Sequence, residues 1–231
     1  MSPFMLSWTR FCYLDTEYMR PDYRVAPLDK FSSSNVELFS IQFAPMKLKR
    51  NRNSIPKLNV LTRDSSKSEL DILKEFWPTW KLFFGNITRP KRLIPMGFVL
   101  TADLQILANK YDQYRQEISE MDPNATEKHF NLSHILQITR FFDLQWPFQL
   151  KHGLVDLSLC AVVESLNNKD TKDIIQELLK PNIEQMTRTQ LEQRFASYVQ
   201  REYETVLDQL WIVLKKTGGI FRPNPSSKPI P

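Results

Sequence analysis

The chain has 231 residues, of which 42% are hydrophobic and 25% are charged, and its formal net charge is +5. That composition is typical of a globular protein with a hydrophobic core and argues against general disorder. Only 5 residues are glycine and only 2 are cysteine. This scarcity argues against glycine-rich phosphate-binding loops, a disulfide framework and a cysteine-based zinc site.

The charge is unevenly distributed along the chain. Basic residues strongly outnumber acidic ones over residues 44–100, whereas residues 101–216 carry a small acidic excess. No stretch approaches the roughly 18 consecutive apolar residues of a membrane-spanning helix. Residues 1–24 mix acidic and basic side chains and lack the apolar segment of a secretory signal. We therefore expect an intracellular protein, cytoplasmic or nuclear, without a membrane span.

Residues 1–35 show no regular hydrophobic period, and Pro21 and Pro27 interrupt any helix that begins before them. Apolar side chains between Met5 and Leu14 could form one short helical face. The many aromatic residues of this segment argue against disorder. We expect an extended arm, beginning with a helical turn, that lies over the main body.

Apolar and polar side chains alternate around Phe39, Ile41 and Phe43, which predicts a strand. A second, weaker strand is predicted over residues 58–62. The intervening run is rich in lysine, arginine and asparagine. The two strands therefore fit a β-hairpin with a long basic tip.

From residue 66 onward the pattern is helical. Ser66 and Glu69 have the spacing of a capping box, and apolar residues at helical spacing follow as far as Gly85, with an interruption at Pro78. Further helices are expected over residues 101–118, 132–142, 154–166, 170–180 and 187–216, with another start at Pro147. The segment 154–166 is apolar on almost every side, so we expect a buried helix at the centre of the fold.

These patterns predict a mainly α fold: a single multi-helix globular domain with a small N-terminal β element and an extended arm. The arm and the β element, with its basic loop, occupy residues 1–65. The helical domain occupies residues 66–216. Residues 217–231 are rich in proline and are predicted to form a flexible tail.

The sequence contains no recognisable enzymatic or metal-binding motif. His129 and His134 are five residues apart, so one helix would not place both on one face. His152 and Asp156 could share a face, but one pair does not make a metal site. Cys160 lies in an apolar run, where a thiol is unreactive. We therefore expect no metal, no cofactor and no catalytic residue, and we predict that the chain is not an enzyme.

Two groups of residues are candidates for binding. The basic group fits nucleic acid, a nuclear import signal or an acidic protein partner, or it forms a solvated loop. It comprises Lys47, Lys49, Arg50, Arg52, Lys57, Arg89, Lys91 and Arg92. The aromatic group fits either the core of the chain itself or the groove of a protein partner. It comprises Trp77, Trp80, Phe83 and Phe84.

Two function classes follow from these groups. The first is a non-enzymatic interaction protein, such as an adaptor, a complex subunit or a viral accessory or nonstructural factor, that binds a protein partner through the aromatic and basic residues. The second is a nucleic-acid-binding component, nucleocapsid-like or ribonucleoprotein, that uses the basic segment 47–57. The sequence favours the first class and leaves the oligomeric state open.

Overall fold

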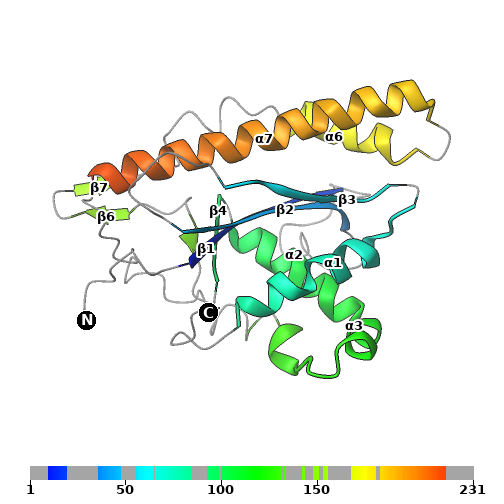
Figure 1. The fold of residues 1–231 in the computed structure, drawn as a ribbon, viewed down its shortest axis with the longest axis horizontal. Helices are drawn as coiled ribbons and strands as arrows, with labels where there is room; N and C mark the ends of the chain where they lie inside the picture. Colours follow the sequence, from blue (N-terminus) through cyan, green and yellow to red (C-terminus); the bar gives the residue numbers. More distant parts are fainter. Residues whose placement is uncertain are drawn as a thin grey trace, which may run out of the picture.

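The computed structural model describes residues 10–19, 36–47, 56–64, 66–84, 93–98, 100–131, 133, 142–143, 148–150, 153–155, 168–180 and 183–216. Within these residues a central β-sheet is covered by helices on both faces (Figure 1). The long helix α7 runs along one face, and helices α1, α2 and α3 cover the other.

The central sheet is mixed, and its strand order is β3-β2-β1-β4-β5. Strand β1 pairs antiparallel with β2 and parallel with β4, β2 pairs antiparallel with β3, and β4 pairs parallel with β5. The five strands are β1 (Arg10–Met19), β2 (Glu37–Lys47), β3 (Asn59–Thr62), β4 (Ile94–Gly97) and β5 (Phe142–Asp143). A separate antiparallel pair consists of β6 (Phe148–Leu150) and β7 (Gly153–Val155).

The helices form two layers. On one side lie α1 (Glu69–Leu82), α2 (Leu100–Gln113), α3 (Arg115–Met121) and the short 3-10 helix η3 (Glu127–His129). On the other side lie α6 (Asn168–Leu178) and the 32-residue α7 (Gln185–Lys216). No helix in the described ranges is long and apolar enough to cross a membrane.

Each face of the sheet has its own hydrophobic core. Successive side chains of a strand point to opposite faces, so β1 contributes to both cores. Phe11 and Tyr13 pack with residues of α6 and α7, whereas Cys12 and Leu14 pack with residues of α1 and α2. Strand β1 is therefore buried on both sides and organises the whole arrangement.

The prediction of a mainly α fold is wrong, because the chain combines a mixed sheet with helices. The segment expected to be an arm contains β1, the middle strand of the sheet. A strand that is buried on both faces reads as a nearly continuous apolar run and lacks the alternation that marks a half-buried strand. That run around residues 11–14 resembled a short helical face for this reason.

Other boundaries differ from expectation in the later part of the chain. Residues 154–155 lie in β7 instead of the expected central helix, and Phe142 lies in β5 instead of a helix. Residues 156–166 and 134–141 lie outside the described residues. The sheet takes β4 and β5 from beyond residue 66, so it joins the two ranges expected as a β element and a helical domain.

The predicted hairpin is confirmed by the antiparallel pairing of β2 with β3, and the predicted helices over residues 170–180 and 187–216 correspond to α6 and α7. Helix α1 is also confirmed, but it continues through Pro78, where an interruption was predicted, and its cap differs. Ser68 is the N-cap, its hydroxyl accepts a hydrogen bond from the Asp71 N–H, and Asp71 completes the capping box. Ser66 instead bonds to Asp64.

Glu69, expected as the acidic half of the cap, is instead a buried link between elements. Its carboxylate forms an ion pair with Lys110 of α2 at 2.9 Å and accepts a hydrogen bond from the Leu38 N–H of β2 at 2.7 Å. The Lys110 and Glu69 side chains are 4% and 8% exposed. Removing one partner of a buried pair leaves an uncompensated charge, which is strongly destabilising.

We predict that Lys110→Met lowers the free energy of unfolding by about 3–5 kcal/mol, because it leaves the buried Glu69 carboxylate without its cationic partner. Urea denaturation measures this loss. The matched control is Lys67→Met, which breaks the more exposed pair with Glu75 and should cost less than about 1 kcal/mol. Equal losses in the two variants would contradict the structural role of the Glu69–Lys110 pair.

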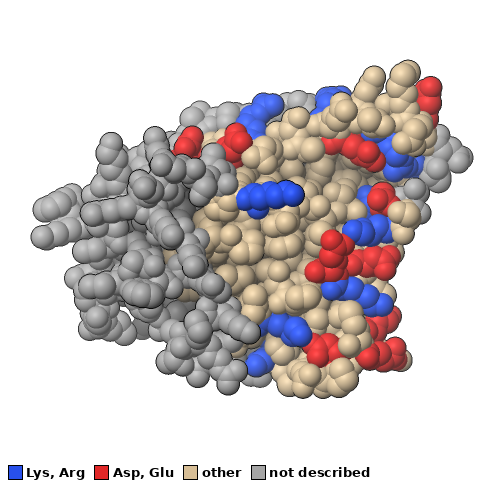
Figure 2. Space-filling view, in the orientation of Figure 1, with Lys and Arg blue, Asp and Glu red and all other residues tan. Residues whose placement is uncertain are grey.

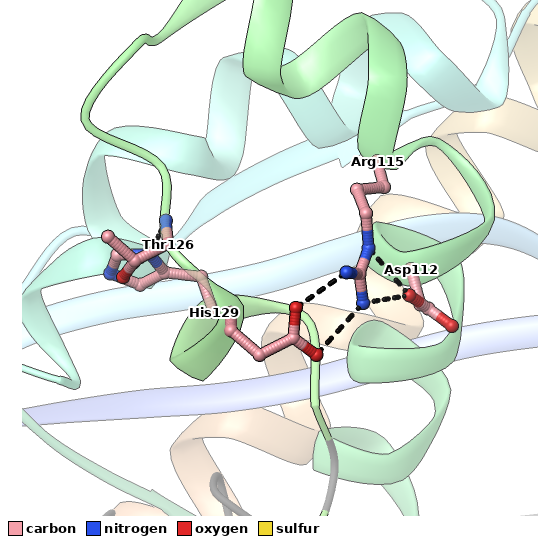
Figure 3. A network of polar contacts seen from close by, with 5 residues as sticks. Asp112, Arg115, Thr126 and His129 are labelled. Atoms are coloured by element: carbon pink, nitrogen blue, oxygen red, sulfur yellow. Dashed lines mark hydrogen bonds and ion pairs between the residues drawn. The ribbon is translucent and has the colours of Figure 1, made fainter.

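Polar contacts hold the segment after α3 in place (Figure 3). The Arg115 guanidinium lies between the carboxylates of Asp112 and Glu127 and bonds to both. Beside it, the Thr126 N–H donates to Nδ1 of His129 at 3.0 Å. Burial, reinforced by the positive charge of Lys128, lowers the pKa of His129 to about 4.

Because of this lowered pKa, the stability of the chain depends on pH in the acidic range. Below the ordinary histidine pKa of 6.5 the unfolded chain binds a proton that the folded chain does not, so the contribution of His129 is lost as pH falls from 6.5 toward 4. His129→Asn should flatten the pH dependence of the unfolding free energy in that window, measured by denaturation at each pH. An unchanged slope in the variant would contradict this assignment.

Candidate functional site

Two acidic residues on β1 face α7. Phe11 and Tyr13 point into the core beneath α7, so the alternation of the strand places Asp15 and Glu17 on the same face. Helix α7 contributes Glu202 from above. One oxygen from each of the three carboxylates lies within 4.8 Å of the others, and all three side chains are half-buried.

A fourth carboxylate, Asp103, belongs to the first turn of α2. It is 5% exposed, and its Oδ1 accepts hydrogen bonds from Thr16 of β1, at 3.2 Å from the backbone N–H and at 2.6 Å from the hydroxyl. We refer to Asp15, Glu17, Asp103 and Glu202 as the carboxylate cluster.

The course of β4 explains how Asp103 reaches β1. The parallel pairing of β1 with β4 extends only from Phe11 to Tyr13 on β1, after which β4 leads into α2. A Cβ atom on Gly97 would lie 2.3 Å from the backbone oxygen of Leu14, so only glycine permits this close approach. The cluster therefore lies near the carboxyl end of β4, and ligands of open α/β sheets usually bind at the carboxyl ends of strands.

The carboxylates of the cluster repel one another. Burial, followed by the negative charges of Glu202, Asp103 and Glu17, raises the pKa of Asp15 well above its ordinary value. Burial likewise raises the pKa of Glu202, while a hydrogen bond from Tyr198 opposes the shift. Like charges at this separation cannot all ionise without a compensating positive charge.

A positive group would stabilise the carboxylate cluster. Oε2 of Glu202 is buried and has no hydrogen-bond partner within the described part of the chain. An unsatisfied buried carboxylate oxygen is costly. A cation among the carboxylates would satisfy this oxygen and neutralise the repulsion.

The kind of cation follows from the donor atoms. The group contains carboxylate oxygens and neither histidine nor cysteine, which suits Mg²⁺ or Mn²⁺ better than Zn²⁺. Such ions polarise phosphoryl oxygens and activate water. Without a cation, neighbouring carboxylates of unequal pKa can exchange protons as a general acid and base.

The predicted basic residues are placed only in part. Lys57 is exposed, and the backbone of Lys47 pairs with that of Arg10 at the far end of β1 from the cluster. Lys49, Arg50, Arg52, Arg89, Lys91 and Arg92 lie outside the described residues. On the face shown in Figure 2, the acidic and basic side chains of the described residues are intermixed instead of forming a patch of one sign.

The predicted aromatic residues lie in the core. Trp77, Trp80, Phe83 and Phe84 are at most 5% exposed. Their polar atoms are also satisfied within the chain: the indole N–H of Trp77 donates to Asp122, and that of Trp80 donates to the backbone oxygen of His129. The structure therefore supports the core interpretation and leaves these side chains almost no surface for a partner.

No member of the carboxylate cluster is among the site residues that the sequence predicts. Asp15 and Glu17 fall among the mixed charges of residues 1–24, Asp103 falls near the start of the helix predicted over residues 101–118, and Glu202 falls in the helix predicted over residues 187–216. One signal was available: an acidic pair two residues apart follows Phe11 and Tyr13 on the same face of a strand. Acidic groups in line with core aromatics are unusual unless they are paired or functional.

Comparison with known proteins does not identify the chain. No protein-family model and no curated protein matches it. A solved structure described as product-bound exonuclease I aligns with 87% of this chain and 46% of its own, at 11% sequence identity and a TM-score of 0.32. This chain thus spans less than half the length of that protein, and a TM-score of this size does not establish a shared fold.

We predict that Glu202→Gln stabilises the cation-free chain at pH 8 by about 1 kcal/mol, because the amide removes one of several repelling charges. Since the folded pKa of Glu202 is raised above its ordinary value of 4.5, the folded chain holds a proton that the unfolded chain has lost. Stability therefore falls as pH rises through the folded pKa, and the gain in the variant should grow from pH 5 to pH 8.

Chemical denaturation in the presence of a chelator measures this effect. Glu192→Gln is the matched control, because Glu192 is an exposed residue of the same helix. Its effect should stay within about 0.5 kcal/mol at every pH. A destabilised Glu202→Gln variant would show that the cluster is not repulsive.

Proposed function

We propose that the chain is a divalent-cation-dependent hydrolase of phosphate esters, with nucleic acid as the substrate class. The observation that carries the proposal is the set of carboxylate oxygens from Asp15, Glu17 and Glu202 within 4.8 Å of one another. Mg²⁺ in proteins is commonly held by one or two carboxylates together with substrate phosphates. The raised pKa values and the unpartnered oxygen of Glu202 both favour a cation at this place.

Each residue of the cluster has a distinct role in this proposal. Asp15 and Glu17 are cation ligands from β1, and Glu202 is the ligand from α7. Asp103 adds negative charge and fixes the β1 backbone through its bonds to Thr16. A bound cation would polarise the phosphate and lower the pKa of a coordinated water.

The substrate class is supported by the charge of the chain. The cluster itself is acidic and would repel a polyanion, so a nucleic acid needs basic residues elsewhere for affinity. The sequence contains such residues: lysine and arginine are concentrated over residues 44–100, and the net charge of the chain is +5. The basic segment 47–57, expected to bind nucleic acid, is here proposed to bind the substrate.

This proposal replaces the preferred expectation of a non-enzymatic interaction protein. The aromatic residues on which that expectation relied are buried. The expectation that nucleic acid is a partner remains, in the form of a substrate.

We expect the chelator-treated chain to bind Mn²⁺ in a calorimetric titration and, with Mn²⁺ or Mg²⁺, to hydrolyse a labelled single-stranded oligonucleotide. Asp15→Asn should lower the hydrolysis rate by at least about 100-fold, comparable to the loss of one transition-state contact. Oligonucleotide binding should weaken steeply with salt, whereas hydrolysis of a small phosphodiester should not.

The matched control is Asp173→Asn, which changes an exposed aspartate of α6 and should leave both measurements unchanged. Failure of the folded wild-type chain to bind Mn²⁺ would eliminate the proposal. Cation binding without hydrolysis of either substrate would retain the cation site and eliminate the hydrolase.

A further inference from the structure

Two polar residues are buried in the sheet face that carries Asp15 and Glu17. Ser40 and Gln42 of β2 are 0% and 1% exposed. Further along the same face, Ala44 and Met46 belong to the hydrophobic core beneath α7. Buried side-chain amides are uncommon in apolar surroundings, because the loss of hydration must be compensated by hydrogen bonds.

The register of the sheet places these residues directly beside the cluster. In the antiparallel pairing of β1 with β2, Gln42 lies opposite Asp15 and Ser40 lies opposite Glu17. Directly opposed residues project from the same face, with Cβ atoms about 4.5–5.5 Å apart. The pairing shifts by one residue after Glu17. The register that places Gln42 opposite Asp15 and Ser40 opposite Glu17 therefore ends there.

The hydrogen bonding of Gln42 is incomplete in one specific way. Its Nε2 donates to the hydroxyl oxygen of Ser40 at 2.7 Å, which fixes the orientation of the amide. Its Oε1 is buried and has no hydrogen-bond partner within the described residues. An acceptor next to several carboxylates cannot be satisfied by those carboxylates when they are ionised, because they are acceptors as well.

We propose that Gln42 and Ser40 form the second layer of the cation site, in which the Gln42 amide oxygen accepts a hydrogen bond from a water molecule bound to the cation. This inference rests on the proposed function. Ser40 is the positioning residue for the amide, and Gln42 is the positioning residue for the water.

The depths of the side chains support a second-layer role over direct coordination. Gln42 is 1% exposed, whereas the three carboxylates opposite and above it are half-buried. The amide therefore lies deeper than the ligands, on the core side of the site. Mg²⁺ retains several of its waters in protein sites, and a hydrated cation offers donors that match an unpartnered acceptor.

The test uses Mn²⁺ as the probe and separates binding from stability. We expect Gln42→Leu to weaken Mn²⁺ binding about 10–100-fold, as is usual when an outer-layer partner of a metal is lost. The same variant should leave the urea midpoint of the chelator-treated chain unchanged or higher, because it removes an unsatisfied buried oxygen. Ser40→Ala should weaken Mn²⁺ binding in the same direction and to a smaller extent.

Gln42→Met provides a second apolar replacement that adapts to the cavity if the leucine variant does not fold. Gln116→Leu is the control, because Gln116 is exposed on α3 and should leave Mn²⁺ affinity unchanged. Unaltered Mn²⁺ affinity in a folded Gln42 variant would overturn the inference while leaving the proposed function intact. Absence of Mn²⁺ binding in the wild type would instead reject the proposed function, and the inference with it.

Discussion

Helices cover both faces of strand β1, and the alternation of its side chains determines which residues pack against each helical layer. Cys12 and Leu14 supply the core beneath α1 and α2, and Phe11 and Tyr13 supply the core beneath α7. The two acidic residues continue the α7 face after the aromatic ones. The packing that secures the strand therefore also fixes the position of Asp15 and Glu17.

Among the described residues, Glu69 and the carboxylate cluster differ in their surroundings. Glu69 is neutralised by Lys110 and by a backbone N–H, and it joins α1, α2 and β2. In the carboxylate cluster, burial and the neighbouring negative charges raise the pKa of Asp15, and burial raises the pKa of Glu202. Burial of like charges costs stability, which the aromatic packing of Tyr13 with Tyr203 and of Phe39 with Phe195 helps to offset. Carboxylates whose pKa is raised by burial and by neighbouring like charges are typical of functional sites.

The sequence predicted the elements that depend on local patterns. The helix after residue 66, the hairpin of β2 with β3 and the long C-terminal helix each have a periodicity or a cap that a short window contains. Strand β1 could not be recognised in this way, since its two apolar faces hide the alternation. Pairing of β1 with β4 joins residues about 80 positions apart, and no local pattern records it.

The cluster was unpredictable for a related reason. Its members come from β1, α2 and α7, and only the fold brings Glu202 to Asp15. The spacing of Asp15 and Glu17 was visible, but its meaning depended on knowing that the segment is a strand. The aromatic group shows the opposite case: its residues were predicted to form either the core or a partner surface, and the contacts of Trp77 and Trp80 favour the core.

Because the pKa values of Asp15 and Glu202 are raised, the cluster should bind protons when no cation is present and release them when Mn²⁺ binds. Calorimetric titrations between pH 5 and 8, in buffers with different ionisation enthalpies, measure the number of protons displaced. This proton linkage predicts Mn²⁺ binding with proton release that declines toward high pH and is reduced in Glu202→Gln. Binding without proton release at any pH, or no binding by the folded chain, would contradict it.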